Sequence, residues 1–331
     1  MKVGLFTAAQ WHPGADLAQG FRDLLEQGRV ARASGFASFL VGQHMLTGPE
    51  MQMFQTVPLM ARLLPEIEGM QIGPGVLLLP MVNPVMAAEE GATIDWMSDG
   101  NYVLAGGLGY RDEEFEAMGT RRADRVPRLV EAVEVIRRLW TEDRVTHHGT
   151  HYRVTGVGAS VLPKQRPHPP IWLGGDVEPA VRRAARIADA WLAAPAASLD
   201  RLQALLAVYR AERAKHGLPT DTRCPIIREC FVGTNAEHAR RVSRGPLLAK
   251  YQAYAAWGQS DTAGTNLADD FDAFSADRFL VGDAAKVRDD LQRLVEVTGT
   301  DHVLVRTQWL GTDQAEAVAA IERIGNLVAK L

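Results

Sequence analysis

Side chains that could do chemistry recur directly after the short apolar runs of this sequence. They are Gln10, Trp11 and His12 after the first run, Gln43, His44 and Met45 after the second, Tyr110 after the fourth, and Arg306 and Trp309 after the last. Because a histidine titrates near neutral pH, His44 could transfer a proton or donate a hydrogen bond to a developing anion. A histidine at the end of a strand can equally serve packing alone.

Glycine-rich turns and one arginine could bind an anion and a flat ligand. Gly174 and Gly175 stand between an apolar run and an expected helix, whose first backbone N–H groups would face an anion. Arg125 could add charge-assisted hydrogen bonds to a phosphate. Asp176 follows the glycine pair, and its carboxylate would repel a phosphate unless it caps the helix. Gly107 opens a second such turn, and glycine-lined floors suit a flat aromatic cofactor.

Alternation of apolar and amphipathic segments indicates how these side chains are positioned. Apolar stretches typical of buried strands occupy residues 2–7, 36–41, 71–79, 101–105, 171–173, 190–193, 226–233 and 302–306. Stretches of helical spacing separate them, and a hairpin is expected around Gly149. About eight strand–helix units without a linker predict an α/β fold, a single (β/α)8 TIM barrel over residues 1–331. An open, doubly wound sheet is the alternative.

In such a barrel, the residues that follow the strands converge on one mouth, where substrates bind. The expected substrate pocket therefore consists of Gln10, Trp11, His12, Met45, Met53, Arg306 and Trp309. The polar segment 258–277 is predicted to be an irregular insertion before the last strand. It could be a mobile lid over the active site or a surface excursion.

Composition and charge exclude several classes of protein. With 47% hydrophobic residues the chain is not disordered, and 36 basic against 40 acidic residues argue against nucleic acid or an anionic membrane as the main partner. No signal peptide or membrane-spanning apolar run is visible, so we expect a cytoplasmic protein. The cysteines Cys224 and Cys230 cannot form a disulfide framework. The histidines around Gly149 lack a ligand set, so no metal site is expected.

A series of short motifs runs through nearly the whole chain. It includes Leu78-Leu79-Pro80-Met81-Val82-Asn83-Pro84, Asp95-Trp96-Met97-Ser98-Asp99-Gly100, Gly107-Leu108-Gly109-Tyr110, Glu114-Phe115, Pro169-Pro170-Ile171-Trp172-Leu173-Gly174-Gly175 and Ala188-Asp189-Ala190-Trp191. Their order and spacing resemble the bacterial luciferase-like superfamily of flavin- or deazaflavin-dependent oxidoreductases. The likeness is weakest over residues 195–275. Asn101 and Asp176 depart from the family pattern, which usually has arginine at the first position and a small polar residue at the second.

The resemblance implies a TIM barrel that binds FMN or the deazaflavin F420 at its C-terminal mouth and assembles into dimers or larger oligomers. It places an active-site histidine at His44. At Gly75-Val76 many relatives carry a non-prolyl cis peptide beneath the flavin ring; an ordinary strand with a packing glycine is the alternative. The expected cofactor-binding residues are Gly75, Val76, Gly107, Tyr110, Arg125, Leu173, Gly174, Gly175, Asp176 and Trp191.

We therefore predict a monooxygenase that uses O₂ and reduced FMN, supplied by a separate flavin reductase, to oxygenate a small organic substrate, with His44 as acid or base. Two alternatives stay open. An F420-dependent enzyme would transfer hydride on the same barrel and would need neither O₂ nor a reductase. A flavin-binding protein without catalysis would need no titratable group beside the ring, and His44 argues against it.

Overall fold

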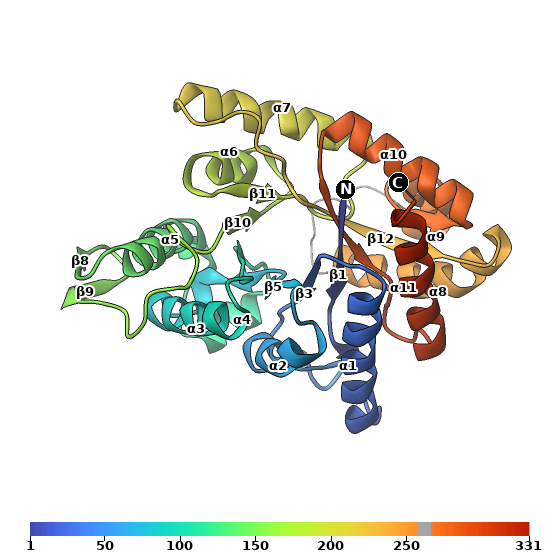
Figure 1. The fold of residues 1–331 in the computed structure, drawn as a ribbon, viewed down its shortest axis with the longest axis horizontal. Coiled ribbons are helices and arrows are strands. Elements are labelled where there is room, and N and C mark those ends of the chain that lie inside the picture. The colour runs from blue at the N-terminus through green and yellow to red at the C-terminus, as the bar shows by residue number, and fades with distance from the viewer. Residues whose placement is uncertain (257–265, 331) are drawn as a thin grey trace.

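Eight parallel strands follow one another around a ring in the part of the chain that this computed structural model describes, residues 1–256 and 266–330 (Figure 1). In ring order they are β1 (Lys2–Thr7), β3 (Ser38–Val41), β5 (Gln71–Pro74), β7 (Leu104–Gly107), β10 (Ile171–Gly174), β11 (Ala190–Leu192), β12 (Ile226–Val232) and β14 (His302–Arg306). The first and last strands pair in parallel, with Lys2 opposite His302. The two ends of the chain therefore contribute neighbouring strands.

The ring closes through two narrow seams. Continuous ladders join β12, β14, β1, β3 and β5 on one side, and β7, β10 and β11 on the other. A single parallel bridge between Ile72 and Tyr102 links the two ladders at one seam, and a bridge between Ala193 and Ile226 links them at the other. Backbone hydrogen bonds of 2.8 to 3.0 Å support both bridges. The predicted (β/α)8 barrel is confirmed.

Helices surround the ring on its outer side (Figure 1). They are α1 (Leu17–Ala33), α2 (Thr56–Leu63), α3 (Pro84–Met97), α4 (Asp112–Ala117), α5 (Arg125–Thr141), α6 (Glu178–Ile187), α7 (Leu199–Lys215), α8 (Ala236–Ala256), α9 (Leu267–Ser275), α10 (Ala284–Thr298) and α11 (Gln314–Val328). Side-chain caps fix several of their starts. Asp16, Asn83, Ser198 and Asp283 each accept a hydrogen bond from a backbone N–H of the first turn.

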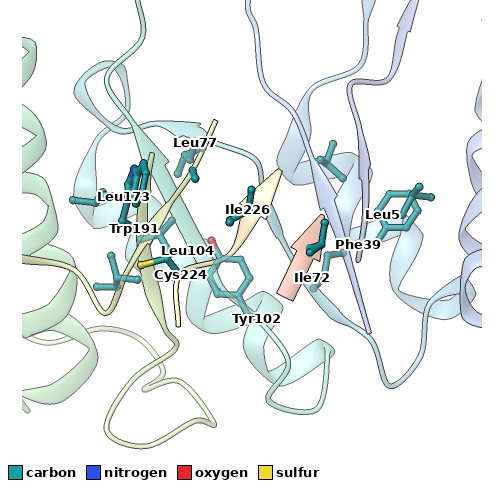
Figure 2. Close-up of a cluster of buried hydrophobic side chains, with 14 of the residues drawn as sticks. Leu5, Phe39, Ile72, Leu77, Tyr102, Leu104, Leu173, Trp191, Cys224 and Ile226 are labelled. Atoms are coloured by element: carbon teal, nitrogen blue, oxygen red, sulfur yellow. The ribbon is translucent and has the colours of Figure 1, made fainter. Parts of the chain in front are cut away.

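Neighbouring residues of each ring strand face two different layers. The inner layer fills the ring and includes Phe6, Leu40, Val103, Trp172, Ile227 and Leu304. The outer layer packs between ring and helices, and Figure 2 shows its members Leu5, Phe39, Ile72, Leu104, Leu173, Trp191 and Ile226. Successive side chains of a strand point to opposite faces, so one apolar run supplies both layers. Each fully buried aliphatic or aromatic side chain stabilises the fold by about 1.5–3 kcal/mol.

The third strand is shorter than the sequence predicts. The run 71–79 is divided into β5 and β6 (Leu77–Leu78), and the Gly75–Val76 peptide bond between them is cis. β6 pairs with the end of β7 through Leu77 opposite Gly106. The alternating hydrophobic pattern of the sequence does not reveal this interruption of the strand.

The segment 258–277 is not wholly irregular, so this prediction is wrong for residues 267–275. They form α9, whose Leu267, Phe271 and Phe274 are buried against Tyr251 and Phe279. These apolar residues recur at helical spacing, which the polar composition of the segment obscured. Residues 258–265 of the predicted lid lie outside the described residues.

Two small antiparallel pairs lie outside the ring. β2 (Gln10–Trp11) pairs with β4 (Gln52–Met53), which draws the segments after β1 and β3 together. The predicted hairpin around Gly149 is formed by β8 (Val145–His148) and β9 (Arg153–Val157), and it projects beside α5 (Figure 1). Within residues 1–256 and 266–330, no helix combines the length and apolar character needed to cross a bilayer.

His302 is a titratable group inside the ring. Its Nε2 lies 2.8 Å from the Ser38 hydroxyl, its ring meets Trp172 edge to face, and 7% of the residue is exposed. Burial, and secondarily the charge of Lys2, lowers the pKa of His302 from 6.5 to about 4. The folded protein therefore holds this imidazole neutral at pH values where the unfolded chain would protonate it.

We expect the free energy of unfolding to fall as the pH drops from 6.5 to about 4, because the unfolded state takes up a proton that folded His302 refuses. The loss attributable to this group reaches about 3 kcal/mol, by 1.36 kcal/mol per pKa unit. Urea denaturation at several pH values measures it. His302→Gln can keep a hydrogen bond to Ser38 without titrating, so its stability should depend less on pH. Equal pH dependence of the two proteins would contradict the prediction.

Candidate active site

A cavity of about 440 Å³ opens at the carboxyl ends of the ring strands. Its wall includes main-chain or side-chain atoms from β1, β6, β7, β10, β11, β12 and β14, and from α8. Twelve of the residues expected from the sequence line it: Gln10, His44, Met53, Gly75, Val76, Gly107, Tyr110, Arg125, Gly174, Gly175, Asp176 and Arg306. The barrel thus brings together residues from nearly the whole length of the chain.

Six expected site residues do not line this cavity. Leu173 and Trp191 belong to the outer layer because their strand neighbours face inward. The indole N–H of Trp191 nevertheless donates to the Gly175 carbonyl over 2.7 Å, so it supports the glycine turn from behind. Trp309 is buried and donates to the Glu229 carboxylate.

The other three, Trp11, His12 and Met45, belong to the segments that follow β1 and β3. Trp11 packs edge to face on Phe54, with ring centres 4.9 Å apart. His12 is exposed. Met45 packs beside Leu78, Met81 and Phe115 rather than on the cavity wall. The sequence correctly placed these residues after the strand ends, but local packing turns their side chains away from the cavity.

Glycines form much of the cavity floor because neighbouring groups approach it closely. A Cβ at Gly107 would come within 2.4 Å of Val76 Cγ2, and a Cβ at Gly75 within 2.5 Å of the Phe6 ring. At Gly174 the corresponding distance to Val76 Cγ1 is 3.3 Å. The floor is therefore apolar and made by Phe6 and Val76 between glycines, a surface on which a flat aromatic ring can lie.

His44 is held between a carboxylate and a phenol. Its Nδ1 lies 3.2 Å from Glu114 Oε1, and its Nε2 lies 3.3 Å from the Tyr110 hydroxyl. The same Glu114 oxygen accepts from the Met45 backbone N–H over 2.8 Å and lies 3.5 Å from Arg111. These contacts fix the orientation of the imidazole at the cavity wall.

Glu114 is ionised although it is fully buried. Burial acts to raise the pKa of its carboxyl, but the hydrogen bonds from His44 and Met45 outweigh it and lower the pKa below its ordinary value. Because a carboxylate only accepts hydrogen bonds, His44 Nδ1 carries the proton that faces it. Nε2 is then the nitrogen that exchanges protons on the Tyr110 side, within the cavity wall. Sequence reasoning assigned Glu114 no role; the Glu114-Phe115 pair in the motif series was its only signal.

One end of the cavity is suited to an anion. Arg122 and Arg125 line it together with the Gly174–Gly175 turn. A Cβ at Gly175 would lie 2.5 Å from Ala180 Cβ, so the turn can approach α6 only with glycine there. Asp176 does not cap that helix, because the N-cap is Val177. Asp176 lines the cavity, and its backbone carbonyl accepts from Arg201 over 3.3 Å.

The next feature is the placement of the side chains that could bind a metal ion. No group of three or more His, Cys, Asp or Glu side chains in them is placed to hold a metal ion. The histidines around Gly149 are held individually. His147 Nε2 lies 3.1 Å from Glu131, and His148 Nε2 lies 3.2 Å from the Thr155 hydroxyl.

Comparison with known proteins now identifies the family. Residues 1–302 match the family model described as luciferase-like monooxygenase. The chain belongs to this family. Its members named below include enzymes of two cofactor types, so membership establishes a luciferase-like oxidoreductase fold and class but not the cofactor.

Three relatives illustrate the range. The chain is 29% identical over 195 residues to an FMNH2-dependent dimethylsulfone monooxygenase of Pseudomonas putida, covering 57% of this chain and 53% of that protein. The FMN complex of the oxygenating constituent of 3,6-diketocamphane monooxygenase from a Pseudomonas putida plasmid superposes with a TM-score of 0.82, at 21% identity over 100% and 98% of the two chains. An F420-dependent secondary alcohol dehydrogenase superposes with a TM-score of 0.80, at 18% identity over 99% and 98%.

The role of Glu114 can be tested by stability. Glu114→Leu leaves the Met45 N–H and the His44 Nδ1–H without an acceptor, so we expect a loss of about 2–3 kcal/mol in the free energy of unfolding. Glu114→Gln keeps an amide oxygen for Met45 and should cost no more than about half as much. Urea denaturation compares them with Glu113→Gln, an exposed neighbour on α4 that should change little. If Leu and Gln were equally tolerated, the hydrogen bonds of Glu114 would not matter.

Proposed function

We propose that this protein is a monooxygenase that uses reduced FMN and O₂ to oxygenate a small organic substrate. The observation that carries the proposal is the Glu114–His44–Tyr110 array at the wall of a glycine-floored cavity. A protein that merely stores a flavin needs no such oriented acid–base group. The dimethylsulfone monooxygenase relative and the FMN-bound structural neighbour support this choice of cofactor.

The residues of the cavity fit FMN. Arg122, Arg125 and the backbone of the Gly174–Gly175 turn would hold its phosphate by charge-assisted and backbone hydrogen bonds. Val76 would lie beneath the ring system, between Gly107 and Gly174. When bound in its reduced form, FMN supplies the electrons that activate O₂. Because such a cofactor has to arrive reduced, a separate flavin reductase is the expected partner.

The protein's own contribution is orientation, water exclusion and proton transfer. Glu114 holds His44 in one tautomer, so that Nε2 can accept or return a proton at the cavity wall. Tyr110 lies in hydrogen-bond range of the same nitrogen and would relay that proton. The apolar side chains Phe6, Val76 and Leu192 line the cavity and would displace water from a bound ligand.

F420-dependent hydride transfer is the second candidate. The F420-dependent alcohol dehydrogenase with the same fold favours it, as does 31% identity over 181 residues to an F420-dependent glucose-6-phosphate dehydrogenase of Microbacterium testaceum. That match covers 52% of each chain. The two candidates differ in the cofactor that the cavity selects.

Titration with FMN, riboflavin and F420 tests the phosphate site and the cofactor together. We expect FMN to bind more tightly than F420. Arg125→Met should weaken FMN binding about tenfold to hundredfold, the value of one or two hydrogen bonds to a charged group. Riboflavin lacks the phosphate, so its binding to the same variant should change little. Arg121→Met removes an exposed arginine outside the cavity wall and serves as the control. Selective, tight F420 binding would replace the first candidate by the second.

His44 can be tested without knowing the substrate. The rate at which O₂ consumes bound reduced FMN is measured by stopped flow at several pH values. We expect His44→Gln to slow this reaction at least about tenfold and to flatten its pH dependence, because general acid–base groups contribute about 10²–10⁴-fold. FMN affinity should stay the same, which separates proton transfer from binding. An unchanged rate and pH profile would exclude His44 as the proton-transfer group.

A further inference from the structure

A second part of the cavity wall is built around buried charges. β12 and β14 are neighbours in the ring, and their register sets Glu229 opposite Arg306. Helix α8 contributes Lys250, Tyr251 and Tyr254 to the same place. Arg306 and the two tyrosines line the cavity, whereas Glu229 is fully buried behind them. Neither Lys250 nor Glu229 was singled out from the sequence.

Glu229 has donors for both of its oxygens. Oε1 accepts from the Lys250 ammonium group and from the Tyr251 hydroxyl at 3.1 Å, and Oε2 accepts from the Trp309 indole N–H. Burial acts to raise the pKa of Glu229, but the positive charges of Lys250 and Arg306 outweigh it and lower the pKa. Lys250 is the direct ion-pair partner of Glu229, and this pair fixes α8 to the ring.

Arg306 makes no direct ion pair with a carboxylate of the described residues, although the effect of burial on its pKa is outweighed by the charges of Tyr254 and Glu229, which raise that pKa. It is 6% exposed, and its guanidinium carbon lies 4.5 Å from the centre of the Phe6 ring. The Tyr254 hydroxyl forms a hydrogen bond with it, yet its Nε has no hydrogen-bond partner among residues 1–256 and 266–330. None of the ion pairs formed between described residues includes Arg306. A desolvated cation of this kind is strongly stabilised by an anion at the same place.

Arg306 and the first anion site lie on opposite sides of the ring. Three strands separate β14 from β7 in either direction. The chain runs from the end of β7 to Arg122 and Arg125. The cavity therefore has two cationic ends with the apolar residues Phe6, Val76 and Ile227 also in its wall. A phosphate bound at Arg122 and Arg125 leaves Arg306 for a different anion.

We propose that Arg306, with Tyr254 beside it, recognises the carboxylate of a small organic acid, which is the substrate. The planar guanidinium presents parallel N–H groups that match the two oxygens of a carboxylate. Leu192 and Ile227 would cover the apolar body of the acid. The role of this acid as the substrate rests on the proposed function, but the binding of a carboxylate at Arg306 does not.

Calorimetric titration with hexanoate and hexanamide tests the inference, because the two probes differ in charge and hardly in shape. The protein is titrated with FMN present and, in a parallel series, without it. We expect the wild type to bind hexanoate at least about tenfold more tightly than hexanamide, the value of a charge-assisted hydrogen bond. Arg306→Met should abolish that preference, whereas Arg306→Lys, which keeps the charge but not the fork, should retain part of it.

Arg122→Met is the matched control at the other end of the cavity. It should weaken FMN binding and leave the preference for hexanoate intact, whereas Arg306→Met should do the reverse. Equal affinity of the wild type for the two probes would overturn the inference, as would an Arg306→Met variant that loses FMN but keeps the preference. If Arg306→Met does not fold, two measurements still test the inference. They are the affinity of the wild type for hexanoate against hexanamide, and the same comparison in Tyr254→Phe, whose preference for hexanoate we expect to be lower. If the wild type prefers hexanoate to hexanamide but does not bind FMN, the proposed monooxygenase activity is rejected and the carboxylate site is retained.

Discussion

Parallel strands that close into a ring must all end at the same rim, and the site of this protein depends on that constraint. It places Phe6 from the first strand against Arg306 from the last, and it sets Gly75, Gly107 and Gly174 around Val76. The alternation of side chains adds a second constraint. Inward-facing residues reach the cavity or fill the ring, and outward-facing ones such as Leu173 and Trp191 are committed to the helices. The position of a residue within the pleat therefore decides whether it can touch a ligand.

Two buried carboxylates, Glu114 and Glu229, orient different polar groups of the cavity. Glu114 accepts from His44 and from the Met45 backbone, so one histidine has a fixed direction and tautomer. Glu229 accepts from Lys250, Tyr251 and Trp309, so helix α8 is fixed and Arg306 is left without an ion-pair partner in the described residues. Both carboxylates are desolvated, and each stays ionised because its donors compensate for burial. Removing a donor from either would raise its pKa and loosen the groups that it holds.

Much of the site could be predicted because strand ends are visible in the sequence. His44, Gly107, Gly174 and Arg306 all follow apolar runs and all line the cavity. The prediction was less accurate for side chains whose direction depends on neighbours far away in the chain. Trp309 turns into the core to donate to Glu229 on another strand, and α9 formed in a segment that its polar composition marked as irregular. Nothing in the local sequence shows which donors Glu114 and Glu229 accept from, since their partners lie on other elements.

The sequence by itself determined the order of strands and helices, hence the barrel, because hydrophobic periodicity reports which faces of each element are buried. It also determined the family, through motifs spread over most of the chain. Only the tertiary structure decided which charged groups neutralise one another. Ion pairs and hydrogen bonds form between atoms a few ångströms apart in space, and residues such as Glu229 and Lys250 become neighbours only when α8 packs against the closed ring. Because Lys250 takes the direct contact with Glu229, Arg306 has no direct ion pair among the described residues, and the expected character of the substrate follows from that.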